Sequence, residues 1–386
     1  MLTLNSYLWD PDTYLYEGDL FSIRWYSVLF ALGFIIGRFL VVGAYKREKK
    51  YDTTVDLQML YMVFGILIGS RIGHVIFYEP EILSRGVQEL FFFWKGGLAS
   101  HGAAIGILSG MALYSYKIVF KDFKIHIKDR LRRGYNYLQV MDRMIIAVAI
   151  GCALIRMGNF FNSETIGLQT QSNYGVLFVN PAEDRIKDQL PFVKNVSFEE
   201  TGEFYKVGQP YLNTKIFFDN EQYKEERIKN SVEKTLSYIL PDKVFTNSSV
   251  FNPNQGKVKH QFKRSESQFY LELSSVGVYR HPAQLYESLN YFLIGIIMFL
   301  ILKKYKIKLR HGSLLAFFFI TAFAGRFILE YFKENQVKNE LFQLNNILGI
   351  SLNLGQLLSI PFVVCGIYFF IRNTKKNPFL ITKNLK

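Results

Sequence analysis

The stretch IIAVAIGCALIRMGNFFNSETIG, residues 145–167, joins a long apolar run to a cluster of polar side chains. The apolar run begins near Ile145, and Arg156, Asn159 and Glu164 stand at its end. A hydrocarbon core about 30 Å thick is crossed by a helix of roughly 20 mostly apolar residues, so the run predicts a membrane-spanning helix. A guanidinium near the boundary of that helix, followed by amides and a carboxylate, resembles a site for an anion.

The composition of the whole chain is that of a membrane protein. Of its 386 residues, 49% are apolar and 16% are aromatic, and the apolar residues are gathered into blocks. Seven blocks have about the length of a spanning helix. They cover approximately residues 25–45, 57–78, 96–119, 138–160, 284–302, 313–332 and 356–371. We expect the first of them to act as the insertion signal, because the first twenty residues lack the basic region and apolar core of a cleavable signal peptide.

The positive charge is concentrated in alternate connections. The segments after the first, third, fifth and seventh predicted spans hold 20 Lys and Arg residues, whereas the N-terminal segment up to Ile23 holds none. By the positive-inside rule the N-terminus lies outside and the C-terminus in the cytoplasm, which requires an odd number of spans. Topology and anionic lipid headgroups thus explain the net charge of +14, and the charge does not indicate a nucleic-acid partner.

The connection between the fourth and fifth predicted spans has a different character. Residues 168–280 are polar, with 15 Lys or Arg against 14 Asp or Glu, and contain five prolines. Alternation in TKIFFDN and QFYLELSSV predicts strands, and the apolar spacing in residues 220–240 predicts a helix. We therefore expect a folded head.

These patterns together predict the fold class. We expect an all-α polytopic membrane protein of seven transmembrane helices with an enlarged extracytoplasmic α+β head. Its parts are an N-terminal membrane part with four spans (residues 1–167), the head (residues 168–280), and a C-terminal membrane part with three spans (residues 281–386).

Ionisable side chains lie inside several of the predicted spans. Arg71 and His74 are in the second, His101 is near the start of the third, and Arg326 and Glu330 are in the sixth. An arginine at the centre of a spanning helix costs about 2.5 to 3.5 kcal/mol, so such residues normally face a protein interior or an aqueous cavity. Each kind of residue has a structural explanation. Arg71 can snorkel or bond to carbonyls of neighbouring helices, Arg326 and Glu330 can neutralise one another at i and i+4, and a single His is more often a packing residue. Together they indicate a polar cavity whose arginines suit phosphate oxygens, as in a lipid headgroup.

Several motifs, in order, resemble those of a known family. IRMGNFFNSETIG, residues 155–167, is similar to the signature G-R-x-G-N-F-x-N-x-E-x-x-G of the bacterial phosphatidylglycerol:prolipoprotein diacylglyceryl transferases, with Ile155 in place of the first glycine. Further segments agree in order and spacing, namely IRWYS, GSRIG, GGLASHGA, RHPAQLYES, GRFILEYFKE and LGQLLSIP. The resemblance covers all seven predicted spans. The sequence departs from the family in its longer head and at Lys333, where the family usually has a second arginine.

The resemblance implies a reaction and a location. Enzymes of this family transfer the sn-1,2-diacylglyceryl group of phosphatidylglycerol to the thiol of the lipobox cysteine in a prolipoprotein signal peptide. The products are a thioether and glycerol 1-phosphate, and the reaction is the first step of lipoprotein maturation. A multi-pass protein of the bacterial cytoplasmic (inner) membrane is implied, with phosphatidylglycerol, prolipoproteins and membrane lipids as partners. The chemistry requires no cofactor and no metal.

The resemblance also implies roles for particular residues. A thiolate is the nucleophile, and a departing phosphate needs cations. We expect Arg156 and Arg326 to hold the phosphate and His101 to accept the thiol proton as the third catalytic residue. Alternatively, a field of arginines lowers the pKa of the thiol and no discrete base exists. The expected substrate-binding residues are Tyr26, Arg71, Asn159, Asn162, Glu164, Gly167, Tyr286 and Glu330.

Two other functions fit part of the pattern. A transporter or flippase for an anionic lipid would also place arginines inside the membrane, although the sequence shows no two halves with matching broken helices. A catalytically silent lipid-binding membrane protein is the second. Both predict that a lipobox peptide keeps its mass.

Overall fold

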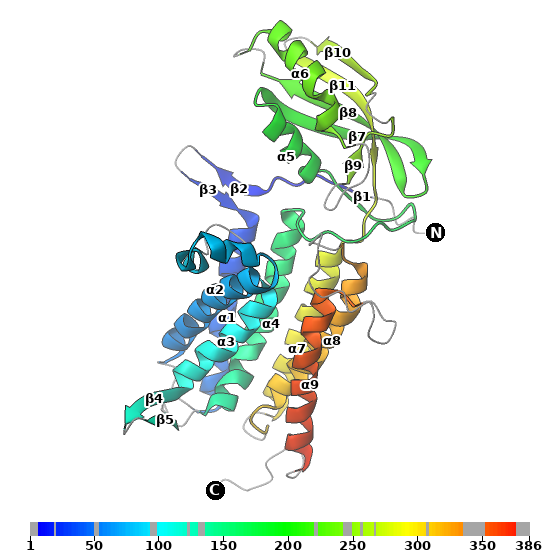
Figure 1. Cartoon of the computed structure of the whole chain (residues 1–386). Coiled ribbons are helices and arrows are strands. Elements are labelled where there is room, and N and C mark those ends of the chain that lie inside the picture. The colour runs from blue at the N-terminus through cyan, green and yellow to red at the C-terminus, as the bar shows by residue number, and fades with distance from the viewer. Residues whose placement is uncertain are drawn as a thin grey trace. The chain divides into compact units, whose positions relative to one another are not determined.

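The computed structural model divides into two compact units (Figure 1). The head unit comprises Met1–Tyr26, Met157–Tyr286 and Phe332–Gln336, and the helical unit comprises Ser27–Arg156, Glu287–Tyr331 and Val337–Lys386. The structure describes residues 7–18, 21–49, 54–92, 99–121, 124–129, 136–219, 223–241, 249–254, 258–265, 268–305, 309–334 and 352–375.

Within the described residues, six helices are long and apolar enough to cross a membrane. They are α1 (Trp25–Arg47), α2 (Val55–Phe77), α4 (Tyr137–Phe161), α7 (Ala283–Tyr305), α8 (Ser313–Leu329) and α9 (Leu354–Lys375). The span of α8 reaches 20 residues, Ser313–Phe332, because the short 3-10 helix η6 (Glu330–Phe332) continues it. These six match six of the seven predicted spans. The chain is thus a polytopic membrane protein.

The third predicted span differs from the other six. Its place is taken by α3 (Ser100–Ser115), whose 16 residues reach about 24 Å, less than the hydrocarbon core of about 30 Å. A β-hairpin follows it, formed by β4 (Tyr116–Lys121) and β5 (Lys124–Asp129). Residues 93–98, which include the predicted beginning of this span, lie outside the described part of the chain. The described helices therefore do not establish a seventh span.

Two short 3-10 helices follow α2, and a seam of glycines lies between α2 and α3. The seam is made up of Gly65, Gly69, Gly73, Gly102, Gly106 and Gly110. The 3-10 helices η1 (Pro80–Arg85) and η2 (Val87–Phe91) follow α2. A Cβ atom on Gly106 of α3 would lie 1.9 Å from the carbonyl oxygen of Gly65 on α2. Because only glycine allows so close an approach, the two helices lie backbone to backbone, as small residues permit in membranes (Figure 1).

A buried aspartate joins α4 to α8. Asp142 is fully buried, and its carboxylate accepts hydrogen bonds from the backbone N–H groups of Gly312 (2.7 Å) and Leu315 (2.9 Å). The first N–H groups of a helix have no partner within the helix, and a carboxylate there also interacts favourably with the helix dipole. Asp142 therefore sets the position at which α8 begins.

The head unit is built on an antiparallel sheet of five strands. The order is β10 (His260–Ser265), β11 (Gln268–Gly277), β8 (Gln209–Phe218) and β7 (Val193–Lys206), and β9 (Val250–Phe251) also pairs with β11. Every second residue of β8 is buried, including Leu212 and Ile216. This alternation confirms the strands predicted in TKIFFDN and QFYLELSSV.

Two helices share the core of this sheet. α5 (Asn180–Gln189) contributes Ile186, and α6 (Glu225–Ile239) contributes Ile228 and Val232 to the same buried cluster as the sheet residues. The helix predicted in residues 220–240 is therefore confirmed. Two small pairs of strands complete the unit, β1 (Tyr7–Trp9) with β6 (Val176–Phe178) and β2 (Tyr14–Glu17) with β3 (Ser22–Arg24).

Candidate active site

Two predicted catalytic arginines meet on one carboxylate inside the helical unit. The Nε atom of Arg156, near the end of α4, lies 2.9 Å from Oε2 of Glu287, in the first turns of α7. The Nη1 atom of Arg326, near the end of α8, lies 3.7 Å from Oε1 of the same glutamate. The Glu287 side chain is only 1% exposed. Three helices thus bring two guanidinium groups to the two oxygens of a single buried anion.

A second carboxylate completes this cluster. Oε2 of Glu330, which follows α8 in the short 3-10 helix η6 (Glu330–Phe332), lies 3.8 Å from Nη2 of Arg326. A Cβ atom on Gly355, in the first turn of α9, would lie 2.6 Å from Oε1 of Glu330, so α9 approaches the carboxylate closely. The two arginines and two glutamates carry no net formal charge, which lowers the cost of burying them.

Glu287 and its neighbour Ser288 are the site residues that sequence reasoning missed. The Ser288 hydroxyl donates a hydrogen bond of 2.8 Å to the carbonyl oxygen of Ala153, one turn before Arg156 on α4, and so fixes α7 against α4 beside the ion pair. Both residues stand in RHPAQLYES. The sequence does contain a signal that could have identified Glu287: it is a carboxylate inside an otherwise apolar predicted span, and ionisable residues inside a membrane normally mark a functional site.

His101 lies in an aromatic environment in the same unit. It belongs to the first turn of α3 and is 2% exposed. Its ring centroid is 6.4 Å from those of both Phe323 and Phe362, and these two rings stack at 4.1 Å. Phe323 precedes Arg326 by one helical turn on α8. The structure therefore places His101 beside the turn that precedes the arginine cluster.

Arg71 has a specific backbone contact. Its side chain is nearly buried, and its Nε and Nη2 atoms donate to the carbonyl oxygen of Glu89 at 3.3 and 3.2 Å. Glu89 belongs to η2, so Arg71 holds this 3-10 helix against α2.

In the head unit, the polar residues of the signature bind one another. The amides of Asn159 and Asn162 donate to the two carboxylate oxygens of Glu164, at 2.8 and 3.2 Å. Gln284 donates to the backbone oxygen of Glu164 at 2.6 Å. The amides and the carboxylate that the sequence predicts as part of the site are thus hydrogen-bonded to one another, and Glu164 orients both asparagines.

Gly167 lies at a point where three backbone segments converge. A Cβ atom there would lie 2.3 Å from the carbonyl oxygen of His281 and 2.7 Å from that of Phe332. Arg280, fully buried, donates to the Gly167 oxygen at 3.0 Å and to Oε2 of Glu334 at 3.0 Å. Only a residue without a side chain allows the three segments to approach so closely.

The two predicted tyrosines also lie in the head unit. A Cβ atom on Gly158 would lie 2.8 Å from Cδ2 of Tyr26, so the Tyr26 ring rests against α4 where that helix carries a glycine. The Tyr286 hydroxyl lies 3.3 Å from Nδ1 of His281, and its ring is 6.2 Å from that of Phe332. Tyr286 is therefore linked to the segments that meet at Gly167.

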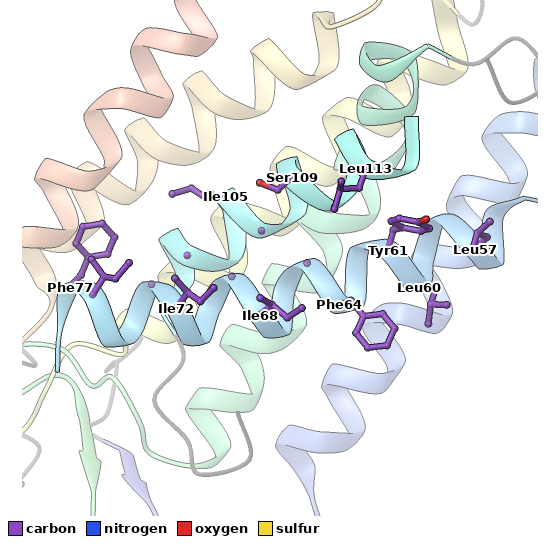
Figure 2. A pocket seen from close by; sticks show the side chains of 17 residues that line it. Leu57, Leu60, Tyr61, Phe64, Ile68, Ile72, Phe77, Ile105, Ser109 and Leu113 are labelled. Atoms are coloured by element: carbon purple, nitrogen blue, oxygen red, sulfur yellow. The ribbon is translucent and has the colours of Figure 1, made fainter. Parts of the chain in front are cut away.

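A separate apolar groove lies along α2 and α3 (Figure 2). It has a volume of about 790 Å³, and the seam of glycines contributes to its lining. Its walls include Phe64, Ile68 and Ile72 from α2 and Ile105 and Leu113 from α3. None of the described residues that line it is acidic or basic. The groove therefore suits a hydrocarbon chain, and its described lining residues supply no charge for a phosphate.

The fold and the arginine cluster define a class: a polytopic membrane protein with buried guanidinium groups suited to an anion at its helix ends. Among the described residues, no group of three or more His, Cys, Asp or Glu side chains could hold a metal ion. A family model described as prolipoprotein diacylglyceryl transferase matches residues 14–372. The chain belongs to this family.

Curated relatives extend the similarity over nearly the whole chain. Proteins named phosphatidylglycerol--prolipoprotein diacylglyceryl transferase from Chloroherpeton thalassium and Tolumonas auensis are each 27% identical to it, over 96% and 95% of this chain and 96% and 98% of their own. The protein of that name from Porphyromonas gingivalis is 28% identical over the full length of both chains. The alignment with the Porphyromonas gingivalis protein thus includes residues 168–280, for which the sequence predicts a head.

Proposed function

We propose that this protein transfers the sn-1,2-diacylglyceryl group of phosphatidylglycerol to the thiol of a lipobox cysteine in a prolipoprotein signal peptide. The product is a thioether, and glycerol 1-phosphate is released. Membership of the family and the names of the relatives support the reaction. The structural observation that carries it is the meeting of Arg156 and Arg326 on one buried carboxylate.

This geometry suggests how the phosphate is held. A guanidinium binds carboxylate and phosphate oxygens with the same planar arrangement of N–H donors. Arg156 and Arg326 already contact the two oxygens of one anion, so they are spaced to contact two oxygens of one phosphate. The thiolate sulfur attacks the glyceryl CH2, the C–O bond to phosphate breaks, and its electrons stay on the leaving phosphate. The two arginines stabilise the additional negative charge.

The thiol proton needs an acceptor, and His101 is our first candidate. Its burial and its position beside the helical turn before Arg326 support this role. The alternative is that the arginines alone stabilise the thiolate. We assign binding or positioning roles to the remaining predicted residues, which are Tyr26, Arg71, Asn159, Asn162, Glu164, Gly167, Tyr286 and Glu330.

We also propose a membrane topology. With α3 as a seventh crossing, the N-terminus and the head lie outside the bacterial inner membrane and the C-terminus lies in the cytoplasm. The alternate placement of basic residues supports this orientation. The lipid donor would then reach the arginines from the outer leaflet.

The decisive experiment is mass spectrometry of a lipobox peptide incubated with purified protein and phosphatidylglycerol. A matched peptide with serine in place of the cysteine is the control. We expect a diacylglyceryl mass gain on the cysteine peptide alone, together with free glycerol 1-phosphate. An unchanged peptide mass with folded protein and several anionic donors would refute the transferase and favour a transporter or flippase for an anionic lipid.

A further inference from the structure

The carboxylate of Glu287 lies between the two arginines to which we assign the substrate phosphate. Its Oε2 is 2.9 Å from Nε of Arg156, and its Oε1 is 3.7 Å from Nη1 of Arg326. Because the Glu287 side chain is 1% exposed, water screens these attractions little. Carboxylate and phosphate oxygens accept the same kind of hydrogen bond from a guanidinium. The two anions therefore compete for the same donors.

A structural role and a competitive role make opposite predictions. Buried arginines need counter-ions, and a glutamate with only this role holds the two guanidinium groups in place, so its loss should displace them and weaken phosphate binding. A glutamate that competes with phosphate should have the reverse effect, because its loss leaves the guanidinium donors to the incoming anion. The sign of the change in affinity separates the two roles.

We infer that Glu287 is an internal competitor of the phosphate group, and that its carboxylate must move off Arg156 and Arg326 before a lipid headgroup binds productively. This inference rests on the proposed function and adds a specificity-determining residue to it. A phosphate alone must displace a buried carboxylate and therefore binds weakly, whereas the glycerol and acyl parts of the whole lipid add contacts that strengthen binding.

The same competition assists release of the product. When the C–O bond breaks, the phosphate gains negative charge and is held more strongly by two buried arginines. Return of the Glu287 carboxylate to these arginines restores the cluster with Glu330, which carries no net formal charge. Glu287 therefore favours departure of glycerol 1-phosphate.

Binding of glycerol 1-phosphate to detergent-solubilised protein tests the inference. Calorimetric titrations would compare wild type with Glu287→Gln, Glu287→Asp and Glu330→Gln. We expect Glu287→Gln to bind about tenfold more tightly, since a charged competitor has been removed. Glu287→Asp keeps the charge and should stay within about threefold of wild type. Glu330→Gln should change the affinity less than Glu287→Gln, because the Glu330 carboxylate pairs with Arg326 whereas that of Glu287 contacts both Arg156 and Arg326. Equal or weaker binding by folded Glu287→Gln would overturn the inference.

A second readout covers the case in which Glu287→Gln is poorly stable. Loss of a buried counter-ion lowers stability, and an anion that replaces it should restore stability. Increasing concentrations of inorganic phosphate should therefore raise the Tm of Glu287→Gln more than the Tm of wild type. Equal increases in Tm would count against competition. Sodium chloride at matched ionic strength is the control.

Kinetics separate this inference from the proposed function. If the wild type is an active transferase, the Glu287→Gln substitution should lower both the KM for phosphatidylglycerol and kcat. It should also increase inhibition by glycerol 1-phosphate, because the product leaves slowly. A raised KM would refute competition and leave the transferase intact. If the wild type shows no transfer but Glu287→Gln binds phosphate more tightly, the competition would be supported and the transferase function refuted.

Discussion

Gly167 and His281 approach each other backbone to backbone: the Gly167 N–H donates to the His281 carbonyl oxygen at 3.0 Å, and a Cβ on Gly167 would lie 2.3 Å from that oxygen. The signature motif and the segment that begins RHPAQLYES are thus joined without an intervening side chain. The same contact explains why a glycine stands at the end of IRMGNFFNSETIG. It also makes Gly167 a sensitive position.

Gly167→Ala should lower stability and abolish most transfer activity. The added methyl group meets backbone oxygens of His281 and Phe332, which are unable to move away by changing a rotamer. We expect a loss of about 1 to 3 kcal/mol, as for other overpacked sites. Gly151→Ala is the matched control, because a Cβ there meets nothing within 4 Å. Thermal unfolding and peptide modification would be measured, and equal behaviour of the two variants would contradict the close approach.

Arg156→Lys and Arg326→Lys should each reduce turnover by at least about a hundredfold, although both keep the positive charge. The reason is that lysine lacks the planar set of donors that contacts two oxygens at once. Arg38→Lys is the control, since Arg38 pairs with Asp56 through exposed side chains. The initial rate of peptide lipidation checks this prediction. Near-normal rates for either arginine variant would remove that residue from the mechanism.

His101→Gln should slow transfer by about 10²- to 10⁴-fold if the imidazole is the proton acceptor. The limb of the rate–pH profile that belongs to the histidine should then disappear, whereas binding of glycerol 1-phosphate should change little. The profile would be recorded with a lipobox peptide. An unaltered profile for His101→Gln would favour the alternative in which the arginines act without a discrete base.

The stability of the head unit should fall on mild acidification. Burial lowers the pKa of His281 below 6.5, so the unfolded chain binds a proton at a pH where the folded chain does not. This contribution to stability is complete above pH 6.5 and is lost as the pH falls through the folded-state pKa. Denaturant unfolding at several pH values would measure it. His281→Gln should show a smaller loss over this window, and an identical loss would assign the effect to other groups.

The sequence by itself determined the membrane class, six of the helices, the alternating strands of the head and the family. These are local properties: a spanning helix needs only a long apolar run, and a half-buried strand needs only alternation. The motif residues were therefore found without knowledge of their contacts. The length of α3 was not predictable in this way, because residues 116–119, three of them apolar, continue the predicted span in sequence but form a strand that pairs with β5.

Only the tertiary structure decided which charged groups meet. Arg156, Glu287 and Arg326 stand on three different helices, and no local pattern states that one carboxylate lies between the two arginines. The contact of Gly167 with His281 is equally nonlocal. Apolar periodicity determines which face of an element is buried, whereas the partners of a buried charge depend on how distant helices pack. That packing is why Glu287 emerged as a site residue from the structure and not from the sequence.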